Sequence, residues 1–128
     1  MSPDTPLLLI VDDEPRILSA LRRSLRREPY RVVAVESFRE AFRVLESQPV
    51  ALLLSDHKMP GMTGLQFLAQ VAERHPRVVR ILITGWMESI PPDEIDPVGV
   101  RAVIDKPWDD VELKQTLRAA LETVSAPP

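Results

Sequence analysis

Five short apolar runs, spaced along the whole chain, limit the folds that are open to it. They are rich in leucine and β-branched residues and lack a strict alternation of polar and apolar positions, and they lie at 7–11, 32–35, 50–54, 78–83 (interrupted by Arg80) and 100–104. Runs of this kind are typical of strands that are covered on both faces. The chain is therefore expected to form a parallel β-sheet with helices on each side.

Segments with helical periodicity separate the apolar runs. In each of them, apolar residues recur three or four positions apart, as in Ile17, Leu21 and Leu25 or in Leu113, Leu117 and Leu121. This spacing places the apolar side chains on one face of a helix. The chain therefore reads as an alternation of strands and helices.

Four helix starts are marked independently of this periodicity. Pro15 can occupy a first helical turn, and three further segments resemble capping boxes: Ser37-x-x-Glu40, Thr63-x-x-Gln66 and Asp109-x-x-Glu112. The fourth helix in chain order has no such mark, and Pro91, Pro92 and Pro97 interrupt its segment. We therefore predict that this helix is short or irregular.

Five strands alternating with about five helices predict a doubly wound α/β domain. The chain has 128 residues, 45% of them hydrophobic, which is enough for one core and leaves no room for a second domain of normal size. In doubly wound domains, ligands bind outside the carboxyl ends of the strands. The residues that follow the apolar runs are therefore the candidates for function.

Charge and cysteine content exclude several classes of function. Sixteen Lys and Arg against 19 Asp and Glu give a net charge of -3, so nucleic acid and anionic membranes are not expected as direct partners. The absence of cysteine excludes disulfides, thiolate nucleophiles and cysteine zinc sites, and agrees with a cytoplasmic location. The first apolar run is too short for a membrane span and lacks the basic flank of a signal peptide.

Acidic residues gather where the first and third strands are expected to end. Asp12 and Asp13 follow the first run, Asp56 follows the third, and Lys106 follows the fifth. Carboxylates this close repel one another by about 1–4 kcal/mol per pair, so the cluster favours a bound cation. Mg²⁺ prefers oxygen ligands and is usually held by one or two carboxylates and a phosphate. A carboxylate at such a site can accept a phosphoryl group as an acyl phosphate.

With these residues, the chain resembles the receiver domains of bacterial two-component response regulators. The resemblance rests on four motifs in the same order, each at a strand end: Asp12-Asp13, the stretch 55–64, Thr84-Gly85 and Lys106-Pro107. It implies a flavodoxin-like fold with strand order 2-1-3-4-5. The receiver domain is expected at 7–124, with a frayed segment at 1–6 and a tail or the start of a linker at 125–128.

The resemblance implies a role for each acidic residue. Asp56 is the phosphoacceptor. The metal, Mg²⁺ or Mn²⁺, is expected to have Asp13, Asp56 and the main-chain carbonyl of Lys58 as ligands, and Asp12 is expected to support it through a water molecule.

Further positions are implied to bind the phosphoryl group or to tune the response. Thr84 and Lys106 bind the phosphoryl group and act as the switch. In the family, an aromatic residue three positions before the lysine moves together with the threonine, but Val103 stands there in this chain. Lys58 and Trp86 occupy positions that modulate the loss of the phosphoryl group to water. Because both side chains are bulky, we predict slow self-dephosphorylation.

The resemblance also implies partners. The phosphoryl donor is expected to be a sensor histidine kinase or a histidine phosphotransfer domain, which the family docks near its first helix; that helix carries arginines at 16, 22, 23, 26 and 27. The signal is expected to pass, through a conformational shift, to an output domain beyond Pro128 or to a separate target, and a phosphorylation-dependent dimer fits the same scheme. Such a chain assists its own phosphotransfer and dephosphorylation but is not a turnover enzyme.

Three other functions are open to a chain of this fold class. A haloacid-dehalogenase-type phosphatase requires a D-x-D-x-T signature, which residues 12–16 do not provide, and a flavodoxin-like cofactor carrier requires a phosphate loop where this chain has carboxylates. A receiver-like interaction module whose output is independent of phosphorylation is suggested by Val103 and by the proline-rich segment 91–97.

His57 and His75 lack a second ligand or nucleophile at useful spacing, so neither is assigned a catalytic role.

Overall fold

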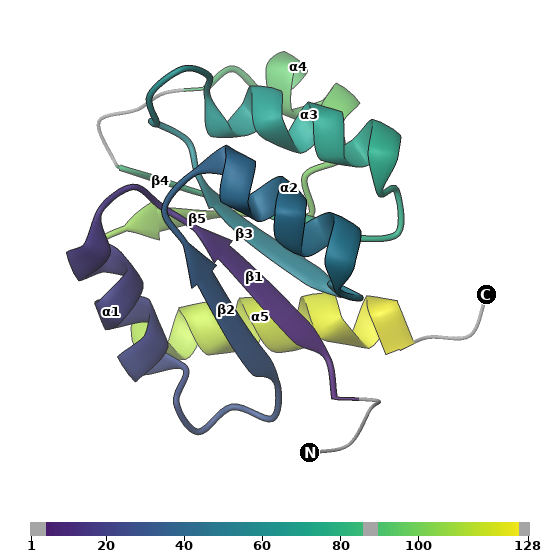
Figure 1. Ribbon diagram of the computed structural model, residues 1–128. Helices are drawn as coiled ribbons and strands as arrows, with labels where there is room; N and C mark the ends of the chain where they lie inside the picture. The colour runs from purple at the N-terminus through teal and green to yellow at the C-terminus, as the bar shows by residue number, and fades with distance from the viewer. Residues whose placement is uncertain (1–4, 86–89, 126–128) are drawn as a thin grey trace.

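A five-stranded parallel sheet forms the centre of the molecule (Figure 1). The computed structural model describes residues 5–85 and 90–125. The strand order is β2-β1-β3-β4-β5, which confirms the predicted order. The strands are β1 (Leu7–Val11), β2 (Arg31–Val35), β3 (Leu52–Asp56), β4 (Val79–Gly85) and β5 (Ala102–Lys106).

Helices cover both faces of the sheet. Helices α1 (Pro15–Ser24) and α5 (Asp110–Ser125) pack on one face, and α2 (Phe38–Ser47) and α3 (Gly64–Arg74) pack on the other. None of the helices within 5–85 and 90–125 combines the length and the apolar character needed to cross a bilayer. The expected α/β architecture with two covered faces is confirmed.

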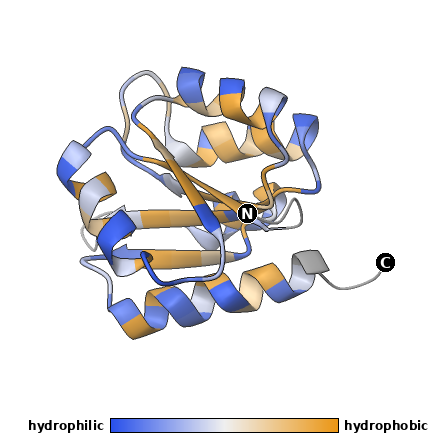
Figure 2. Ribbon diagram, turned by 60° about the horizontal axis from the view of Figure 1, so that its bottom comes forward, coloured by the Kyte–Doolittle hydropathy of each residue, from blue (hydrophilic) through white to orange (hydrophobic). Residues whose placement is uncertain are grey.

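The strand side chains alternate between two separate cores. In β1, Leu8 and Ile10 join the core beneath α1 and α5, whereas Leu9 and Val11 join the core beneath α2 and α3. All five residues of β1 are buried. Because successive side chains of a strand point to opposite faces, a strand covered on both sides must be apolar throughout. Figure 2 shows the result as strands that are hydrophobic along most of their length.

The predicted helix starts are confirmed by their hydrogen bonds. Pro15 is in the first turn of α1, and the Ser37 hydroxyl accepts a hydrogen bond from the Glu40 amide at 3.1 Å. Thr63 and Gln66 form a complete capping box at the start of α3. At the start of α5, the Asp109 carboxylate accepts from the Glu112 amide at 2.9 Å. These caps satisfy amide groups that have no partner within their own helix.

The fourth helix is short, as the prolines predicted. Helix α4 spans Pro92–Ile95 and continues as the 3₁₀ turn η1 (Asp96–Val98), which ends at Gly99 with a φ of 72°. The Arg80 guanidinium of β4 donates to the carbonyl oxygens of Val98 at 3.3 Å and Gly99 at 3.5 Å. Burial lowers the pKa of Arg80 below its ordinary value. The residue that interrupts the fourth apolar run therefore holds the end of η1 against the sheet.

Three of the predicted strands were placed too early in the chain. The apolar runs suggested 50–54, 78–83 and 100–104, whereas the strands extend to Asp56, Gly85 and Lys106. The reason is that a strand is defined by main-chain pairing, which continues through polar residues: Asp56 lies opposite Ile83, and Lys106 lies opposite Gly85. Several candidate residues therefore lie within the last part of a strand instead of beyond it.

Candidate functional site

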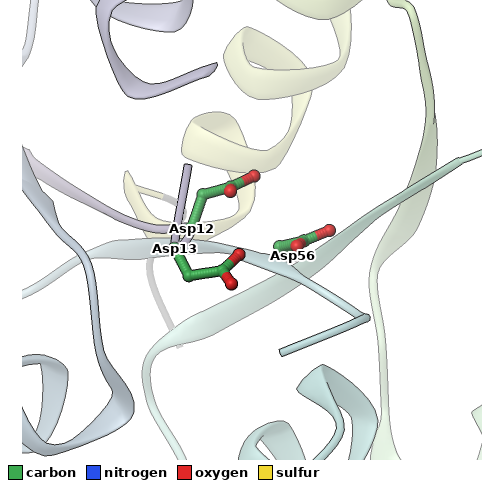
Figure 3. Close-up of side chains that lie close together, drawn as sticks. All are labelled: Asp12, Asp13 and Asp56. Carbon is green, nitrogen blue, oxygen red and sulfur yellow. The ribbon is translucent and has the colours of Figure 1, made fainter. Parts of the chain in front are cut away.

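Three aspartates meet at the carboxyl edge of the sheet. Asp12 and Asp13 follow β1 directly, and Asp56 is the last residue of the neighbouring strand β3, in which Ser55 lies opposite Val11. Each aspartate offers one carboxylate oxygen, and these oxygens all lie within 4.8 Å of one another. Figure 3 shows the three side chains gathered between the ends of the two strands. The parallel pairing of β1 with β3 thus brings together residues that are far apart in the sequence.

The three carboxylates differ in their exposure. Asp12 is 0% exposed and Asp56 is 4% exposed, whereas Asp13 lies at the surface. One Asp12 oxygen accepts a hydrogen bond from the Glu14 amide at 2.9 Å. Burying a carboxylate costs free energy unless it has hydrogen bonds or a counter-charge. The buried pair therefore depends on a cation from the protein.

Lys106 supplies that cation from the end of β5. Its Nζ donates to an Asp12 oxygen at 2.8 Å and to an Asp56 oxygen at 3.0 Å, and its side chain is 19% exposed. Burial alone would lower the pKa of Lys106, but the hydrogen bonds and the charges of Asp12 and Asp56 outweigh it, so the pKa is raised. Lys106 therefore remains protonated at neutral pH and links β1, β3 and β5.

This ion pairing predicts a pH-dependent stability. Because the folded-state pKa of Lys106 lies above its ordinary value of 10.5, its contribution is fully present below that pH and is lost as the pH rises through the folded-state pKa. We expect Lys106→Met to lower the free energy of unfolding by about 2 kcal/mol. Urea unfolding in EDTA should show this difference unchanged between about pH 8 and about pH 10 and shrinking above. A difference that grew with pH would contradict the assignment.

Thr84 and Gly85 complete the edge from the adjacent strand β4. Thr84 is 4% exposed, and Gly85 lies opposite Lys106 in the sheet. An open cleft at this edge is lined by Asp13, Glu14, Asp56, Lys58, Met59, Pro60, Gly85 and Lys106. The cleft opens onto the acidic cluster, which can thus be reached by a small ligand.

Gly64 allows the start of α3 to lie close to the main chain of Asp56, a role that the sequence interpretation did not assign to it. It is the first residue of α3, and its amide donates to the His57 carbonyl at 2.7 Å. A Cβ at this position would overlap the main-chain carbonyl oxygen of Asp56 and lie 2.8 Å from the Asp56 carbonyl carbon. The sequence carries one signal for this role, namely a glycine directly after the capping threonine. Because glycine is a poor helix former, its presence in the first turn of a helix indicates close packing that leaves no space for a side chain.

The family comparison matches most of the chain. Residues 8–118 match the family described as the response regulator receiver domain. The chain belongs to this family.

Curated relatives of the receiver domain are transcriptional regulators. The chain is 43% identical over 126 residues to the hydrogenase transcriptional regulatory protein HoxA of Cupriavidus necator, covering 95% of this chain and 25% of that protein. It is 39% identical over 129 residues to the transcriptional regulatory protein GlrR of Escherichia coli, covering 99% of this chain and 28% of that protein. The chain therefore spans about a quarter of the length of these two relatives.

Solved receiver domains share its fold. The signal receiver domain of an HD domain-containing protein from Pseudomonas fluorescens superposes with a TM-score of 0.89 and 33% identity, covering 94% of this chain and 98% of that chain. A CheY-like receiver domain protein from Methanospirillum hungatei superposes with a TM-score of 0.87 and 26% identity, covering 95% and 98%. The fold and the family inferred from the sequence are both confirmed.

The receiver brings most of the predicted site residues together. The cleft is lined by Asp13, Asp56, Lys106 and the exposed Lys58. Asp12 belongs to the same acidic cluster and contacts Lys106. Trp86 lies outside the described residues. Val103 is 45% exposed on β5. His57 and His75, which were assigned no role, use their amides in main-chain hydrogen bonds to Ile83 and Val71.

The loop after Lys106 is anchored to the first and last helices. The Lys106–Pro107 peptide bond is cis, and the next residue, Trp108, donates from its indole nitrogen to Ser24 at 3.3 Å and to Asp110 at 3.1 Å. Ser24 in turn donates to Asp110 at 2.7 Å. The segment that carries the site lysine is thus tied to both α1 and α5.

Proposed function

We propose that the receiver domain accepts a phosphoryl group on Asp56 in a reaction that requires Mg²⁺. The observation that carries this proposal is the geometry of the acidic cluster. Three aspartates present oxygens within 4.8 Å of one another, and Lys106 contacts two of them. A phosphoacceptor site needs this combination of a nucleophilic oxygen and positive charge around it.

The donor atoms fit a hard divalent cation. Within the described chain the cluster offers carboxylate oxygens and no His or Cys ligand, a set that suits Mg²⁺ or Mn²⁺. Asp13, Asp56 and the main-chain carbonyl of Lys58 would hold the metal directly, with Asp12 acting through water. When bound, the metal offsets negative charge on the phosphoryl oxygens.

The transfer is a displacement at phosphorus. A carboxylate oxygen of Asp56 forms a bond to phosphorus as the bond to the donor's imidazole nitrogen breaks. The imidazole leaves with the bonding electron pair and takes up a proton. Lys106 neutralises part of the developing charge, and the Thr84 hydroxyl donates a hydrogen bond to a phosphoryl oxygen. Lys58 and Trp86 are proposed to slow hydrolysis, in which water attacks the phosphorus and releases inorganic phosphate and the free Asp56 carboxylate.

The proposed partners follow from this chemistry. A sensor histidine kinase or a histidine phosphotransfer domain would donate the group and would dock near the arginines of α1, and the reaction would take place in the cytoplasm. Of the five arginines expected on the first helix, only those at 16, 22 and 23 lie within α1, because the helix ends at Ser24; those at 26 and 27 follow it. Phosphorylation adds charge that draws Thr84 and Lys106 inward and thereby shifts the domain. The relatives' names support transcriptional output, through a further domain or a separate target, and a phosphorylation-dependent dimer is one form that the active state can take.

Uptake of phosphoryl groups from acetyl phosphate tests the proposal. We expect uptake with Mg²⁺ and none in EDTA, read as a mobility shift on a phosphate-affinity gel. Asp13→Asn should lower the rate at limiting Mg²⁺ by at least about 10-fold, because it removes a metal ligand. The matched control Glu73→Gln removes one exposed charge on α3 and should leave the rate unchanged. Uptake that persisted in EDTA would refute the metal dependence.

A further inference from the structure

Strand β2 forms the edge of the sheet opposite β5 (Figure 1), and within the described residues it is hydrogen-bonded to β1 alone. The Arg31 amide donates at 2.9 Å and the Val35 carbonyl accepts at 3.2 Å in hydrogen bonds to residues at the two ends of β1. Because the main-chain groups of successive strand residues point to opposite sides, those of Val32 and Ala34 point away from the sheet. The outer edge of β2 therefore presents the donors and acceptors that a further strand needs.

The edge of β2 lacks the features that usually protect an edge strand. Such strands commonly carry a proline, a bulge or an inward-pointing charge, or are covered by another segment. The three central residues of β2 are apolar and half-buried, and the pairing with β1 is continuous from Arg31 to Val35. Outside the sheet, no main-chain hydrogen bond reaches Val32 or Ala34 from elsewhere in the described chain. The edge is therefore open to the main chain of another molecule.

A basic pocket borders this edge on the side of α1. Three exposed arginines line it, at 22, 23 and 26, and Val32 connects it to β2. No residue of α5 lines it. Its volume is about 550 Å³, larger than the acidic cleft at about 490 Å³. This α1–β2 pocket is thus large enough for side chains of a strand placed beside β2.

The positive charge of the α1–β2 pocket is not balanced. None of its three arginines forms a salt bridge with another described residue. The next carboxylate in the chain, that of Glu28, is bound to Arg118 at 2.7 Å. Arg22 and Arg23 lie in the last turn of α1, where positive charge is favourable, but Arg26 lies beyond the helix. The three charges are therefore available to an acidic ligand.

We propose that an extended acidic segment of a partner protein pairs with the edge of β2 as a sixth strand. Its main chain would bond to Val32 and Ala34, and its carboxylates on the α1 face of the sheet would meet the arginines of the α1–β2 pocket. In strand addition of this kind, main-chain hydrogen bonds give affinity and side-chain pockets give specificity. The inference goes beyond the proposed function and does not depend on phosphoryl transfer.

Two other occupants fit the same surface less well. A second copy of the chain, paired antiparallel through its own β2, would place its arginines on the same face as those of the first copy, and the like charges would repel. Nucleic acid carries matching negative charge but lacks the alternating N–H and C=O groups that the edge of β2 can bind. The net charge of -3 also repels a polyanion at longer range.

Binding of a labelled peptide tests the charge complementarity. The probe has about eight residues, a usual strand length, with glutamate alternating with threonine. Its affinity is measured by fluorescence anisotropy in EDTA without a phosphoryl donor. We expect Arg22→Gln with Arg26→Gln to weaken binding about 10-fold. The control pair Arg77→Gln with Arg101→Gln makes the same charge change at exposed positions before β4 and β5 and should stay within about twofold.

N-methylated peptides test the main-chain pairing. Methyl groups on every second amide block one edge of the peptide strand and leave its charge unchanged. The two possible sets of methylated positions block opposite edges. We expect one set to weaken binding at least about 10-fold and the other to change it by less than about threefold.

Hydrogen exchange followed by NMR locates the contact. When the peptide binds, amide exchange at Val32 and Ala34 should slow at least about 10-fold, because these N–H groups gain partners. Exchange at Val33, whose amide faces β1, should change by less than about threefold.

Several results would overturn the proposal. They are the absence of peptide binding, equal weakening by both arginine pairs, equal effects of both methylated sets, and unchanged exchange at Val32 and Ala34. Equally tight binding of an oligonucleotide of the same charge, without protection of these amides, would assign the pocket to nucleic acid. Protection of both amides in the concentrated chain alone would assign the edge to a second copy.

Discussion

Asp56→Asn should abolish phosphoryl uptake, with a loss of more than about 100-fold, because a neutral amide is not a nucleophile towards phosphorus. The substitution is nearly isosteric, and the amide oxygen can still accept the hydrogen bond that Asp56 receives from Lys106 at 3.0 Å. Uptake from acetyl phosphate with saturating Mg²⁺, read on a phosphate-affinity gel, measures the effect.

The controls separate lost chemistry from lost structure. Asp93→Asn makes the same chemical change at an exposed position of α4 and should keep full uptake. Asp56→Asn itself should unfold in urea at a midpoint no lower than that of the wild type, because it removes one of three mutually repelling carboxylates. Undiminished uptake by folded Asp56→Asn would place the phosphoryl group on another residue.

Gly64→Ala should be the most destabilising small substitution near the site, lowering the free energy of unfolding by more than about 4 kcal/mol. The new Cβ would overlap the carbonyl oxygen of Asp56, and neither main chain can move cheaply. Asp56 is paired in the sheet with β4, and Gly64 is held by its hydrogen bond to His57. Urea unfolding followed by circular dichroism measures the loss.

Gly61→Ala is the matched control three residues earlier. Gly61 has a φ of 89° and no atom within 4 Å of the position that a Cβ would take. Alanine there should cost only about 1–2 kcal/mol of backbone strain. Equal losses for the two variants would show that general loop disruption, instead of overlap with Asp56, explains the effect. The folded fraction of Gly64→Ala should also take up phosphoryl groups more slowly, since small displacements of a nucleophile are costly.

Local chemistry explains why so much of the fold follows from the sequence. A strand buried on both faces leaves an uninterrupted apolar run such as Leu7–Val11, and the capping residues Ser37, Thr63 and Asp109 act on amides only a few positions away. The prolines around α4 keep that helix short through their own rings, which fix φ and remove the amide hydrogen-bond donor. Each of these signals is complete within a few residues, so no knowledge of distant contacts is needed.

The rest depends on contacts between distant residues. That Lys106 reaches both Asp12 and Asp56 follows from strand pairing, and the need for glycine at 64 arises from the passing chain at Asp56. Likewise, Arg80 appeared to interrupt a strand, but its guanidinium binds carbonyls of η1 eighteen or more positions away.

Because β5 lies at the edge of the sheet, the strands that carry the site residues are not all restrained to the same degree. Strands β1 and β3 are each hydrogen-bonded to two neighbours, whereas β5 is bonded to β4 alone. The aspartates thus lie at the ends of strands that are hydrogen-bonded on both sides. Their counter-ion, Lys106, lies at the end of a strand that is hydrogen-bonded on one side only. We therefore expect a change of charge at Asp56 to shift the free edge of β5 before it moves β1 or β3.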